Sequence, residues 1–386
     1  MSGGGLFSAF ALRGTRLRNR IAISPMQQYM AGADGLPGDW HHQHYGRLAI
    51  GGAGLVVTEA LAVAPEGRVT WHDLGLWNDA QADAMAAIAA EIARFGAVPA
   101  TQLIHAGRKG SVSRPWDGYA PLDAASAARG EPPWTTLAPA AEPANPGWHV
   151  PAALDADGIR RVIDAFHAAA ARAARAGFRW LEVHGAHGYL IHSFLSPLSN
   201  RREDGWGGDF AGRSRFALAV AEAVRAAWPA DRPLAFRLSC VDDQDGGWTL
   251  ADSVALAGLL ARAGVDLIDC SSGGLGERTT TRMLRRPEGY QVPYAERIRA
   301  EAGVPTMAVG LITTPHFADA AIRDGRCDLV AIGREALFNP HWPLHAAQAL
   351  GADPGFAAWP PAWGWWLDKR ARAAEARETW HMQTGG

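Results

Sequence analysis

Cysteine is scarce in this chain. Only three of the 386 residues are cysteines, Cys240, Cys270 and Cys327, and no two of them have the CxxC spacing of a redox or metal-binding pair. A disulfide framework and a cysteine-built metal site are therefore not expected, and a reducing cytoplasm is the predicted location.

Like charges do not cluster, and long hydrophobic runs are missing. The 37 Lys and Arg residues nearly balance the 39 Asp and Glu residues, so no broad field for nucleic acid or acidic lipid is expected. The N-terminal MSGGGLFSAFALRG lacks the basic start and apolar core of a signal peptide, and no stretch approaches the ~18 apolar residues of a membrane helix. We expect a small-molecule ligand, with no membrane or nucleic-acid partner.

Two common nucleotide-binding motifs are also missing. No GxGxxG follows an expected strand, and no GxxxxGK[ST] occurs. Neither a Rossmann dinucleotide site nor a P-loop is therefore expected.

Short β-rich runs alternate with longer Ala-rich stretches of helical periodicity. This alternation is typical of a parallel sheet covered by helices, and eight such strands close a (β/α)₈ TIM barrel. The length and the 48% hydrophobic content suit one domain, residues 1–386. The expected strands are Ile21–Pro25, Gly54–Ala60, Pro99–His105, Trp180–His184, Leu234–Ser239, Leu267–Ser272, Pro305–Gly310 and Leu329–Arg334.

Local signals mark the ends of the intervening helices. Asp79, Asp155 and Thr314-Pro315 stand where helices are expected to begin. Glycines shortly before five strands suit left-handed helix ends, namely Gly96, Gly177, Gly264, Gly303 and Gly325.

Two regions break the repeat. Residues 106–154 are rich in Pro, Trp and Ala without a long helical period, which predicts a lid-like excursion after the third strand. Residues 351–386 form a C-terminal segment, with four tryptophans in 351–367 and a charged end that is either helical or frayed. Within the lid, Arg114 and Trp116 are candidates to meet substrate or nicotinamide, and a surface role fits them equally well.

A polar cluster follows the fourth strand. Alternation directs Glu182 and His184 into the barrel, and His187 and Tyr189 follow in GAHGYL, where flanking glycines suit a tight loop. Three interpretations are open: structural histidines, a metal pair completed by Glu182, or a ligand-binding pair. In the third, neutral imidazoles donate hydrogen bonds to an oxygen that gains charge during reduction, and the phenol supplies a proton.

Inward polar residues occur on other strands as well. Arg237 faces inward by alternation, so it needs an anion, which is either Glu182 in a structural ion pair or an electron-accepting ring that becomes anionic. Gln102 also faces inward, and its amide matches the edge of a flavin pyrimidine. Gly310 and Gly333-Arg334 stand where many barrels bind phosphate, although these glycines could be turn residues only.

These residues lie within longer motifs that span nearly the whole chain. The chain resembles the old yellow enzymes, FMN-dependent NAD(P)H ene-reductases, and especially their xenobiotic-reductase and thermophilic-like branches. The motifs that carry the resemblance are NRIAISPM, DWHHQHYGRLAIGGAGLVVTEA, APEGR, QLIHAGRK, EVHGAHGYLIHSFLSPLSNRREDGWGG, AFRLS, DLIDCSSGG, AVGLIT and DLVAIGRE.

The resemblance implies roles for individual residues. His184 and His187 would bind the substrate's activating oxygen, and Tyr189 would donate the proton. Tyr29 and Trp366 would contact substrate, the latter on a C-terminal piece that sometimes reaches a neighbouring subunit, so a homo-oligomer (dimer or tetramer) is implied. FMN would be held by Ser24, Pro25, Met26, Gln27, Ala60, Gln102, Arg237, Gly310, Gly333 and Arg334.

The resemblance also implies the reaction: ping-pong reduction of activated C=C bonds in enones, nitroalkenes or related acceptors, with NAD(P)H as electron donor. Gln27 departs from the branch pattern, because SPMQ replaces the usual SPMC close to the flavin. Flavin-dependent isomerisation or desaturation at the same site is therefore an alternative. A metal-dependent hydrolase using Glu182, His184 and His187 is a minor one, although no metal is expected.

Overall fold

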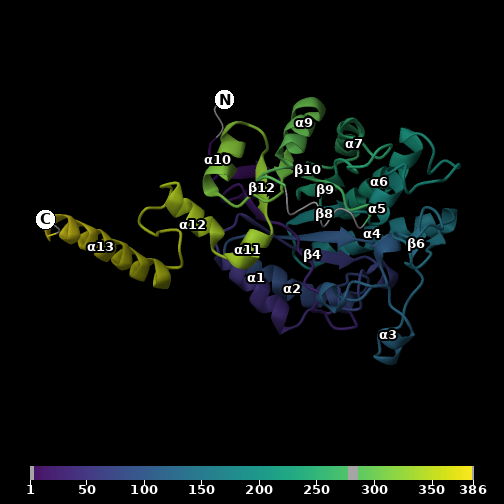
Figure 1. Ribbon diagram of the computed structural model, residues 1–386, viewed down its shortest axis with the longest axis horizontal. Coiled ribbons are helices and arrows are strands. Elements are labelled where there is room, and N and C mark those ends of the chain that lie inside the picture. Colours follow the sequence, from purple (N-terminus) through teal and green to yellow (C-terminus); the bar gives the residue numbers. More distant parts are fainter. Residues whose placement is uncertain (1–3, 277–285, 385–386) are drawn as a thin grey trace.

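Eight parallel strands close into a barrel in the computed structural model, which describes residues 4–276 and 286–384 (Figure 1). Each strand pairs with the next along the chain, and the last pairs with the first. The predicted (β/α)₈ barrel is therefore confirmed, with strand ends that differ by a few residues. The strands are β3 (Ile21–Ile23), β4 (Leu55–Ala62), β5 (Val98–Ile104), β8 (Trp180–Gly185), β9 (Leu234–Ser239), β10 (Leu267–Ser271), β11 (Thr306–Ala308) and β12 (Leu329–Ile332).

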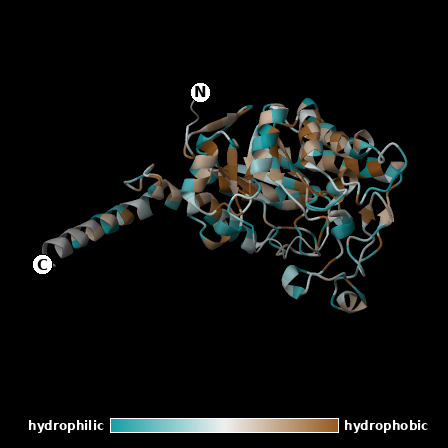
Figure 2. Cartoon of the chain, turned by 45° about the horizontal axis from the view of Figure 1, so that its top comes forward, coloured by the Kyte–Doolittle hydropathy of each residue, from teal (hydrophilic) through white to brown (hydrophobic). Residues whose placement is uncertain are grey.

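Helices cover the outside of this barrel, and hydrophobic residues concentrate in the strands and on the helix faces that meet them (Figure 2). The helices after the strands are α1 (Asp39–Ile50), α2 (Asp79–Arg94), α4 (Ala156–Arg175), α5 (Leu190–Leu195), α6 (Phe210–Ala227), α7 (Leu250–Arg262), α9 (Val292–Ala302), α10 (Pro315–Arg323), α11 (Arg334–Phe338) and α12 (Trp342–Ala349).

Strand alternation separates two hydrophobic layers. Leu181 and Val183 of β8 pack in the outer layer between barrel and helices. Trp180 of β8 and Ala235 of β9 pack inside the barrel. Because side chains alternate along a strand, Glu182, His184 and Arg237 share the inward face, as predicted.

An N-terminal hairpin closes one end of the barrel. Strands β1 (Phe10–Leu12) and β2 (Thr15–Leu17) pair antiparallel. Leu17 is fully buried and packs in the interior layer with Leu55 and Leu329, near the starts of their strands. The open mouth therefore lies at the C-terminal ends of the strands, where this fold carries its chemistry.

The helix-end signals are confirmed. Asp155 accepts a hydrogen bond from the Gly158 N–H at 2.6 Å and caps α4, and α10 begins at Pro315 after Thr314. Helix α2 begins at Asp79, but its capping side chain is Asn78. The five glycines predicted to end helices all have positive φ angles, between 69° and 95°.

The excursion of residues 106–154 contains only short elements. They are the 3₁₀ helices η2 (Gly107–Lys109) and η3 (Pro115–Asp117), the helix α3 (Ala124–Ala128) and the paired strands β6 (Leu137–Ala138) and β7 (Ala152–Ala153). A further 3₁₀ helix, η1 (Pro65–Gly67), follows β4.

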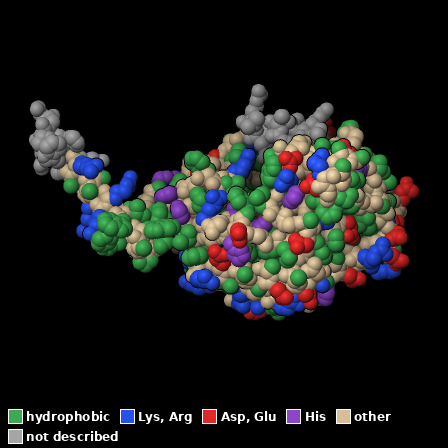
Figure 3. All heavy atoms as spheres, turned by 90° about the horizontal axis from the view of Figure 1, so that it is seen from below, with side chains coloured by type: hydrophobic (Ala, Val, Ile, Leu, Met, Phe, Trp, Pro, Cys, Tyr) green, Lys and Arg blue, Asp and Glu red, His purple; other side chains and the backbone are tan. Residues whose placement is uncertain are grey.

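The C-terminal helix α13 (Pro361–Thr384) projects from the barrel as an arm (Figure 1). Hydrophobic side chains gather on the part of the arm nearer the barrel, beside Lys and Arg side chains (Figure 3). Trp363, Trp365 and Trp366 are 40%, 54% and 66% exposed. None of the described helices has the length and apolar character needed to cross a membrane.

Candidate active site

A cavity of about 960 Å³ opens at the mouth of the barrel. This volume is at the upper end of the range of ligand pockets, about 300–1,000 Å³. The excursion contributes Lys109, Tyr119 and Trp148 to its wall. The cavity-lining residues that were predicted from the sequence are Ser24, Pro25, Met26, Tyr29, His187, Arg237, Gly310, Gly333 and Arg334.

His184 and His187 meet at the end of β8. Their rings pack edge to face at 5.0 Å, and His184 Nε2 is 3.3 Å from His187 Nδ1. His187 lines the cavity, whereas His184 is 5% exposed and lies behind it. Burial, followed by the positive charge of Arg237, holds the pKa of each imidazole well below its ordinary value. Both rings are therefore neutral at neutral pH.

Hydrogen bonds constrain the tautomers of the pair. His184 Nδ1 accepts from the Ala186 N–H at 3.1 Å, so the proton of His184 is on Nε2, facing His187. His187 Nε2 lies 2.6 Å from Ser271 Oγ. In the structure, the His184 Nε2–H donates to His187 Nδ1 at 3.3 Å, so the proton of His187 is on Nε2 and is donated to Ser271 Oγ. When the Ser271 hydroxyl donates instead, the proton of His187 is on Nδ1, and both imidazole N–H groups face the space between the rings. An acceptor oxygen placed there would receive two hydrogen bonds.

Tyr189 lies beside the histidines, within a group of aromatic side chains. Tyr189 packs edge to face against His184 at 5.0 Å, and it shares a hydrophobic cluster with Tyr29, Tyr119 and Trp148. Burial, followed by the neighbouring Tyr119, raises the pKa of Tyr189 well above its ordinary value. The phenol therefore keeps its proton and is available as a donor.

The anion beside Arg237 is Asp269, which corrects the predicted alternative of an ion pair with Glu182. Arg237 Nε lies 3.1 Å from Asp269 Oδ2, and the two residues face each other on β9 and β10. Asp269 is fully buried, whereas the cavity-lining Arg237 is 7% exposed. The alternation of LIDCSS, with Ile268 and Cys270 in the outer layer, is the sequence signal that could have found this carboxylate.

Glu182 bonds to Gln102 instead. The Gln102 Nε2 donates to Glu182 Oε1 at 2.7 Å, and both side chains are buried. Burial and the nearby charge of Asp269 raise the pKa of Glu182 to about 8. Glu182 is therefore largely protonated at neutral pH. Burial also raises the pKa of Asp269, and the positive charge of Arg237 opposes that rise.

Gln27 reaches across to β4. Its Oε1 accepts from the Ala60 N–H at 2.7 Å, while its Nε2 is buried without a hydrogen-bond partner among the described residues. Buried donors in proteins are normally paired. A ligand oxygen, such as a ring carbonyl, would satisfy this amide, so the residues present fit a flavin ring here.

The predicted phosphate residues follow the seventh and eighth barrel strands, and they line the same cavity. Gly310 follows β11 with a φ of 122°, and a Cβ built there would lie 3.0 Å from Gln291 Nε2. Gly333 and Arg334 follow β12, and both line the cavity. Arg334 has no ion-pair partner among residues 4–276 and 286–384, which suits a cation that binds phosphate.

Lys109 is a site residue that sequence reasoning did not assign. Its Nζ donates to the carbonyl oxygens of His187 and Gly274 at 2.9 and 2.8 Å, and it lies 5.3 Å from the Tyr189 ring centroid. Burial lowers its pKa to about 8. Its position in HAGRK, directly after a barrel strand, is the signal that could have indicated it.

Other predicted residues lie away from the cavity wall. Arg114 pairs with Asp117 at 2.7 Å, and Trp116 packs edge to face on Tyr29 at 5.9 Å. Trp366 lies on the projecting arm and is not brought to the cavity of its own chain. Within the described residues, no group of three or more His, Cys, Asp or Glu side chains is arranged to hold a metal.

Comparisons with known proteins agree with this geometry. Residues 5–353 match the NADH:flavin oxidoreductase / NADH oxidase family. An NADPH dehydrogenase of Geobacillus thermodenitrificans is 42% identical over 347 residues, which are 90% of this chain and 94% of the relative. The relative's length is therefore covered almost completely.

Solved structures give the same result. Morphinone reductase is 28% identical with a TM-score of 0.73, and the alignment covers 90% of each chain. The old yellow enzyme homologue from Zymomonas mobilis is 25% identical with a TM-score of 0.73, covering 90% of this chain and 93% of that one. The chain therefore belongs to the NADH:flavin oxidoreductase / NADH oxidase family, and it is an FMN-dependent NAD(P)H oxidoreductase of the old yellow enzyme type.

Proposed function

We propose that the protein reduces activated C=C bonds of enones, nitroalkenes or related acceptors by a ping-pong reaction with NAD(P)H. The observation that carries this proposal is the pair of neutral imidazoles, His184 and His187, beside the protonated phenol of Tyr189. Such a set can hold a polarised oxygen and deliver a proton, which is what reduction of an activated alkene requires besides hydride.

FMN would be held at two ends of the cavity. Gly310, Gly333 and Arg334 would bind its phosphate, and Arg237 would stand beside the ring. The remaining ring contacts would come from Ser24, Pro25, Met26, Gln27, Ala60 and Gln102. The chemistry that FMN supplies when bound is hydride uptake from NAD(P)H and hydride delivery to an acceptor, in two separate half-reactions.

The side chains of this chain do the rest. In the proposed complex, the Ser271 hydroxyl would donate to His187 Nε2, so that His184 Nε2–H and His187 Nδ1–H would both donate to the acceptor oxygen. Tyr189 gives its proton to the α-carbon and regains one from solvent. The aromatic side chains of Tyr29, Tyr119 and Trp148 form an apolar wall that suits a planar, conjugated acceptor.

The test is stopped-flow reduction of the bound flavin by NADPH, followed by reoxidation with enones, nitro compounds and acyl thioesters. Reoxidation by an enone or nitroalkene, with the saturated product recovered, is expected. If NADPH reduces the flavin but no activated alkene reoxidises it, the proposed acceptor class is wrong.

Isomerisation or desaturation at the same site is the second candidate. Gln27 is the residue that favours this candidate. It stands where the related branches have a cysteine near the flavin, and its amide oxygen accepts from the Ala60 N–H. Anaerobic incubation without NAD(P)H separates the candidates, since isomerisation needs no net electrons. A double-bond shift under those conditions would support isomerisation.

A further inference from the structure

The turn that carries the site residues has an unusual backbone. His187 and Gly188 have φ angles of 60° and 77°, so two successive residues are left-handed between β8 and α5. L-residues rarely adopt this conformation, and it persists only when the surroundings enforce it. The turn presents His187 on one side of Gly188 and Tyr189 on the other.

A second loop packs directly against the turn. A Cβ added to Gly188 would lie 2.4 Å from the Gly274 carbonyl oxygen, and one added to Gly274 would lie 2.5 Å from His187 Cα. Side chains are therefore excluded at both positions, and small shifts of either loop would move His187.

The peptide bond between His187 and Gly188 is held at both of its polar ends. Its carbonyl oxygen accepts from Lys109 Nζ at 2.9 Å. Its N–H, that of Gly188, donates to His192 Nδ1 at 2.8 Å. The plane of this peptide sets the backbone direction between His187 and Gly188, on which the placement of the His187 and Tyr189 side chains depends.

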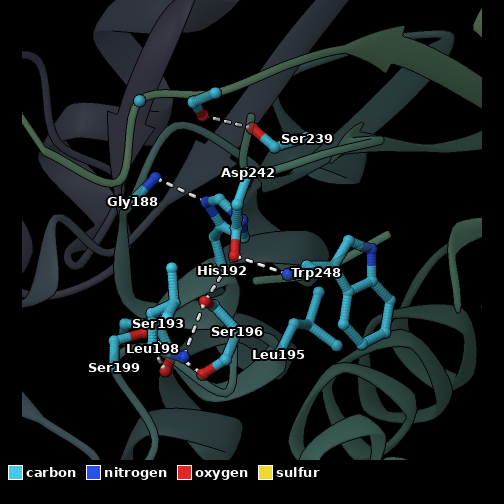
Figure 4. A network of polar contacts seen from close by, with 12 residues as sticks. Gly188, His192, Ser193, Leu195, Ser196, Leu198, Ser199, Ser239, Asp242 and Trp248 are labelled. Carbon is cyan, nitrogen blue, oxygen red and sulfur yellow. Dashed lines mark hydrogen bonds and ion pairs between the residues drawn. The ribbon is translucent and has the colours of Figure 1, made fainter. Parts of the chain in front are cut away.

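His192 is fixed in turn by a buried carboxylate. His192 Nε2 is 2.8 Å from Asp242 Oδ1, while Ser196 Oγ and the Trp248 N–H donate to Asp242 Oδ2 at 2.6 and 2.7 Å (Figure 4). His192 and Asp242 are 0% and 2% exposed. Burial alone would raise the pKa of Asp242, but hydrogen bonds from His192, Ser196 and Trp248 lower it below its ordinary value.

This arrangement sets the tautomer of His192. Because Nδ1 accepts from Gly188, the proton is on Nε2 and is donated to Asp242. An ionised Asp242 can accept from all three donors at once. The pair therefore keeps an acceptor in front of the Gly188 N–H.

We infer that His192 and Asp242 are positioning residues, which hold the His187–Gly188 peptide so that His187 and Tyr189 point at the acceptor. The inference rests on the proposed roles of His187 and Tyr189. Neither positioning residue lines the cavity. They act through the hydrogen bond from the Gly188 N–H to His192, in the way that orienting partners of functional imidazoles act in other sites.

Asp242→Asn is the sharpest test. If its oxygen still accepts from Ser196 and Trp248, its amide N–H₂ faces His192 Nε2, which must then accept. The proton of His192 then moves to Nδ1. His192 Nδ1 and the Gly188 nitrogen are now both donors, so the hydrogen bond between them is lost. Ser196→Ala is the matched control, because it removes one hydrogen bond of Asp242 without changing the tautomer.

The measurements separate positioning from a general structural effect. For Asp242→Asn holoenzyme we expect flavin reduction by NADPH to change less than about twofold, while reoxidation by an enone falls roughly 10–100-fold and the Kd of the enone for the oxidised enzyme rises. Ser196→Ala should change all three less than about twofold. Equal losses in both half-reactions, or equal effects of the two variants, would overturn the inference.

Two further variants of His192 distinguish a loss of positioning from a folding defect. The Asn amide in His192→Asn can replace Nδ1 and accept from Gly188, whereas the longer Gln amide in His192→Gln replaces Nε2 and reaches only Asp242. Reoxidation should therefore be faster in His192→Asn than in His192→Gln at equal thermal stability. The reverse order would contradict a role through Gly188.

Failure of the proposed function is recognised separately. If no activated alkene reoxidises even the wild-type flavin, the acceptor class is wrong, and the positioning inference is then judged by ¹⁵N NMR of the histidine rings. The wild type should show His192 with its proton on Nε2, and Asp242→Asn should move it to Nδ1 and shift the His187 resonances. Unchanged His187 resonances after that move would overturn the inference.

Discussion

Arg237 and Asp269 form an ion pair inside the barrel, with Arg237 Nε 3.1 Å from Asp269 Oδ2 on the neighbouring strand. The guanidinium lines the cavity and the carboxylate lies behind it, fully buried. The positive charge offered to a bound ring is thus partly neutralised by the protein itself. Removal of Asp269 and removal of Arg237 should therefore change the reduction potential of the flavin in opposite directions.

Asp269→Asn should raise the reduction potential of the bound flavin. Loss of the carboxylate leaves the charge of Arg237 uncompensated, and a net positive site favours an anionic reduced ring. Arg237→Met should lower the potential. Both are measured by equilibration with redox dyes, and an unchanged or lower potential in Asp269→Asn would contradict the expected influence of Asp269.

Glu182→Gln should change how stability depends on pH. Burial raises the pKa of Glu182 from 4.5 to about 8, so between about pH 4.5 and 8 the folded chain keeps a proton that the unfolded chain has lost. The contribution of Glu182 to the free energy of unfolding of the wild type therefore decreases as pH rises through this window. Glutamine mimics the protonated acid but does not titrate, so its contribution does not change with pH.

Relative to the wild type, Glu182→Gln should thus become more stable as pH rises from about 4.5 to 8. Denaturant unfolding at several pH values measures the difference. Parallel stability curves for the two proteins would show that Glu182 is not protonated in the folded state. Its hydrogen bond from Gln102 should survive, because the glutamine carbonyl also accepts.

Tyr189→Phe should retain fold and flavin yet lose a rate factor of roughly 10² for poorly activated alkenes, which is the usual scale of acid catalysis. Because the pKa of Tyr189 is raised well above its ordinary value, the wild-type rate should show no loss of this acid at moderately alkaline pH. Tyr119→Phe is the matched comparison, since Tyr119 belongs to the same cluster. If Tyr189→Phe is unaffected, Tyr29, Tyr119 or water supplies the proton.

His184→Ala should weaken acceptor binding and slow reoxidation, while reduction of the flavin by NADPH changes less. His184 supplies an N–H toward His187 and supports the Tyr189 ring, but it does not line the cavity. Stopped-flow measurement of each half-reaction checks this. Similar losses in both would mean that His184 mainly supports the structure around the cavity.

The fold was predictable because its signals are local. Two-residue alternation, helix caps and glycines before strands placed the eight strands and put His184 and Arg237 on the inward face. The partners across strands were harder, because barrel shear is a non-local property. Glu182 stands opposite Ala235, so Arg237 is paired with Asp269 instead.

The lid contacts had no comparable signal. Tyr119 and Trp148 pack at 5.7 Å in a region without secondary-structure period, where sequence gives composition but not direction. The C-terminal segment is a similar case, because the family match ends at residue 353 and α13 begins at Pro361. Its charged end was expected to be either helical or frayed, and neither the start of α13 nor its direction away from the barrel has a local signal in the sequence.

Deleting residues from Ala358 onward should lower the oligomeric state of the protein. The arm exposes Trp363, Trp365 and Trp366 far more than is usual for tryptophan on a monomer, and a second copy of this chain is the expected partner. Light scattering of the full and shortened chains measures the mass. Activity should fall together with assembly if Trp366 reaches a neighbouring site. A shortened chain with unchanged mass would show that the arm does not hold copies together.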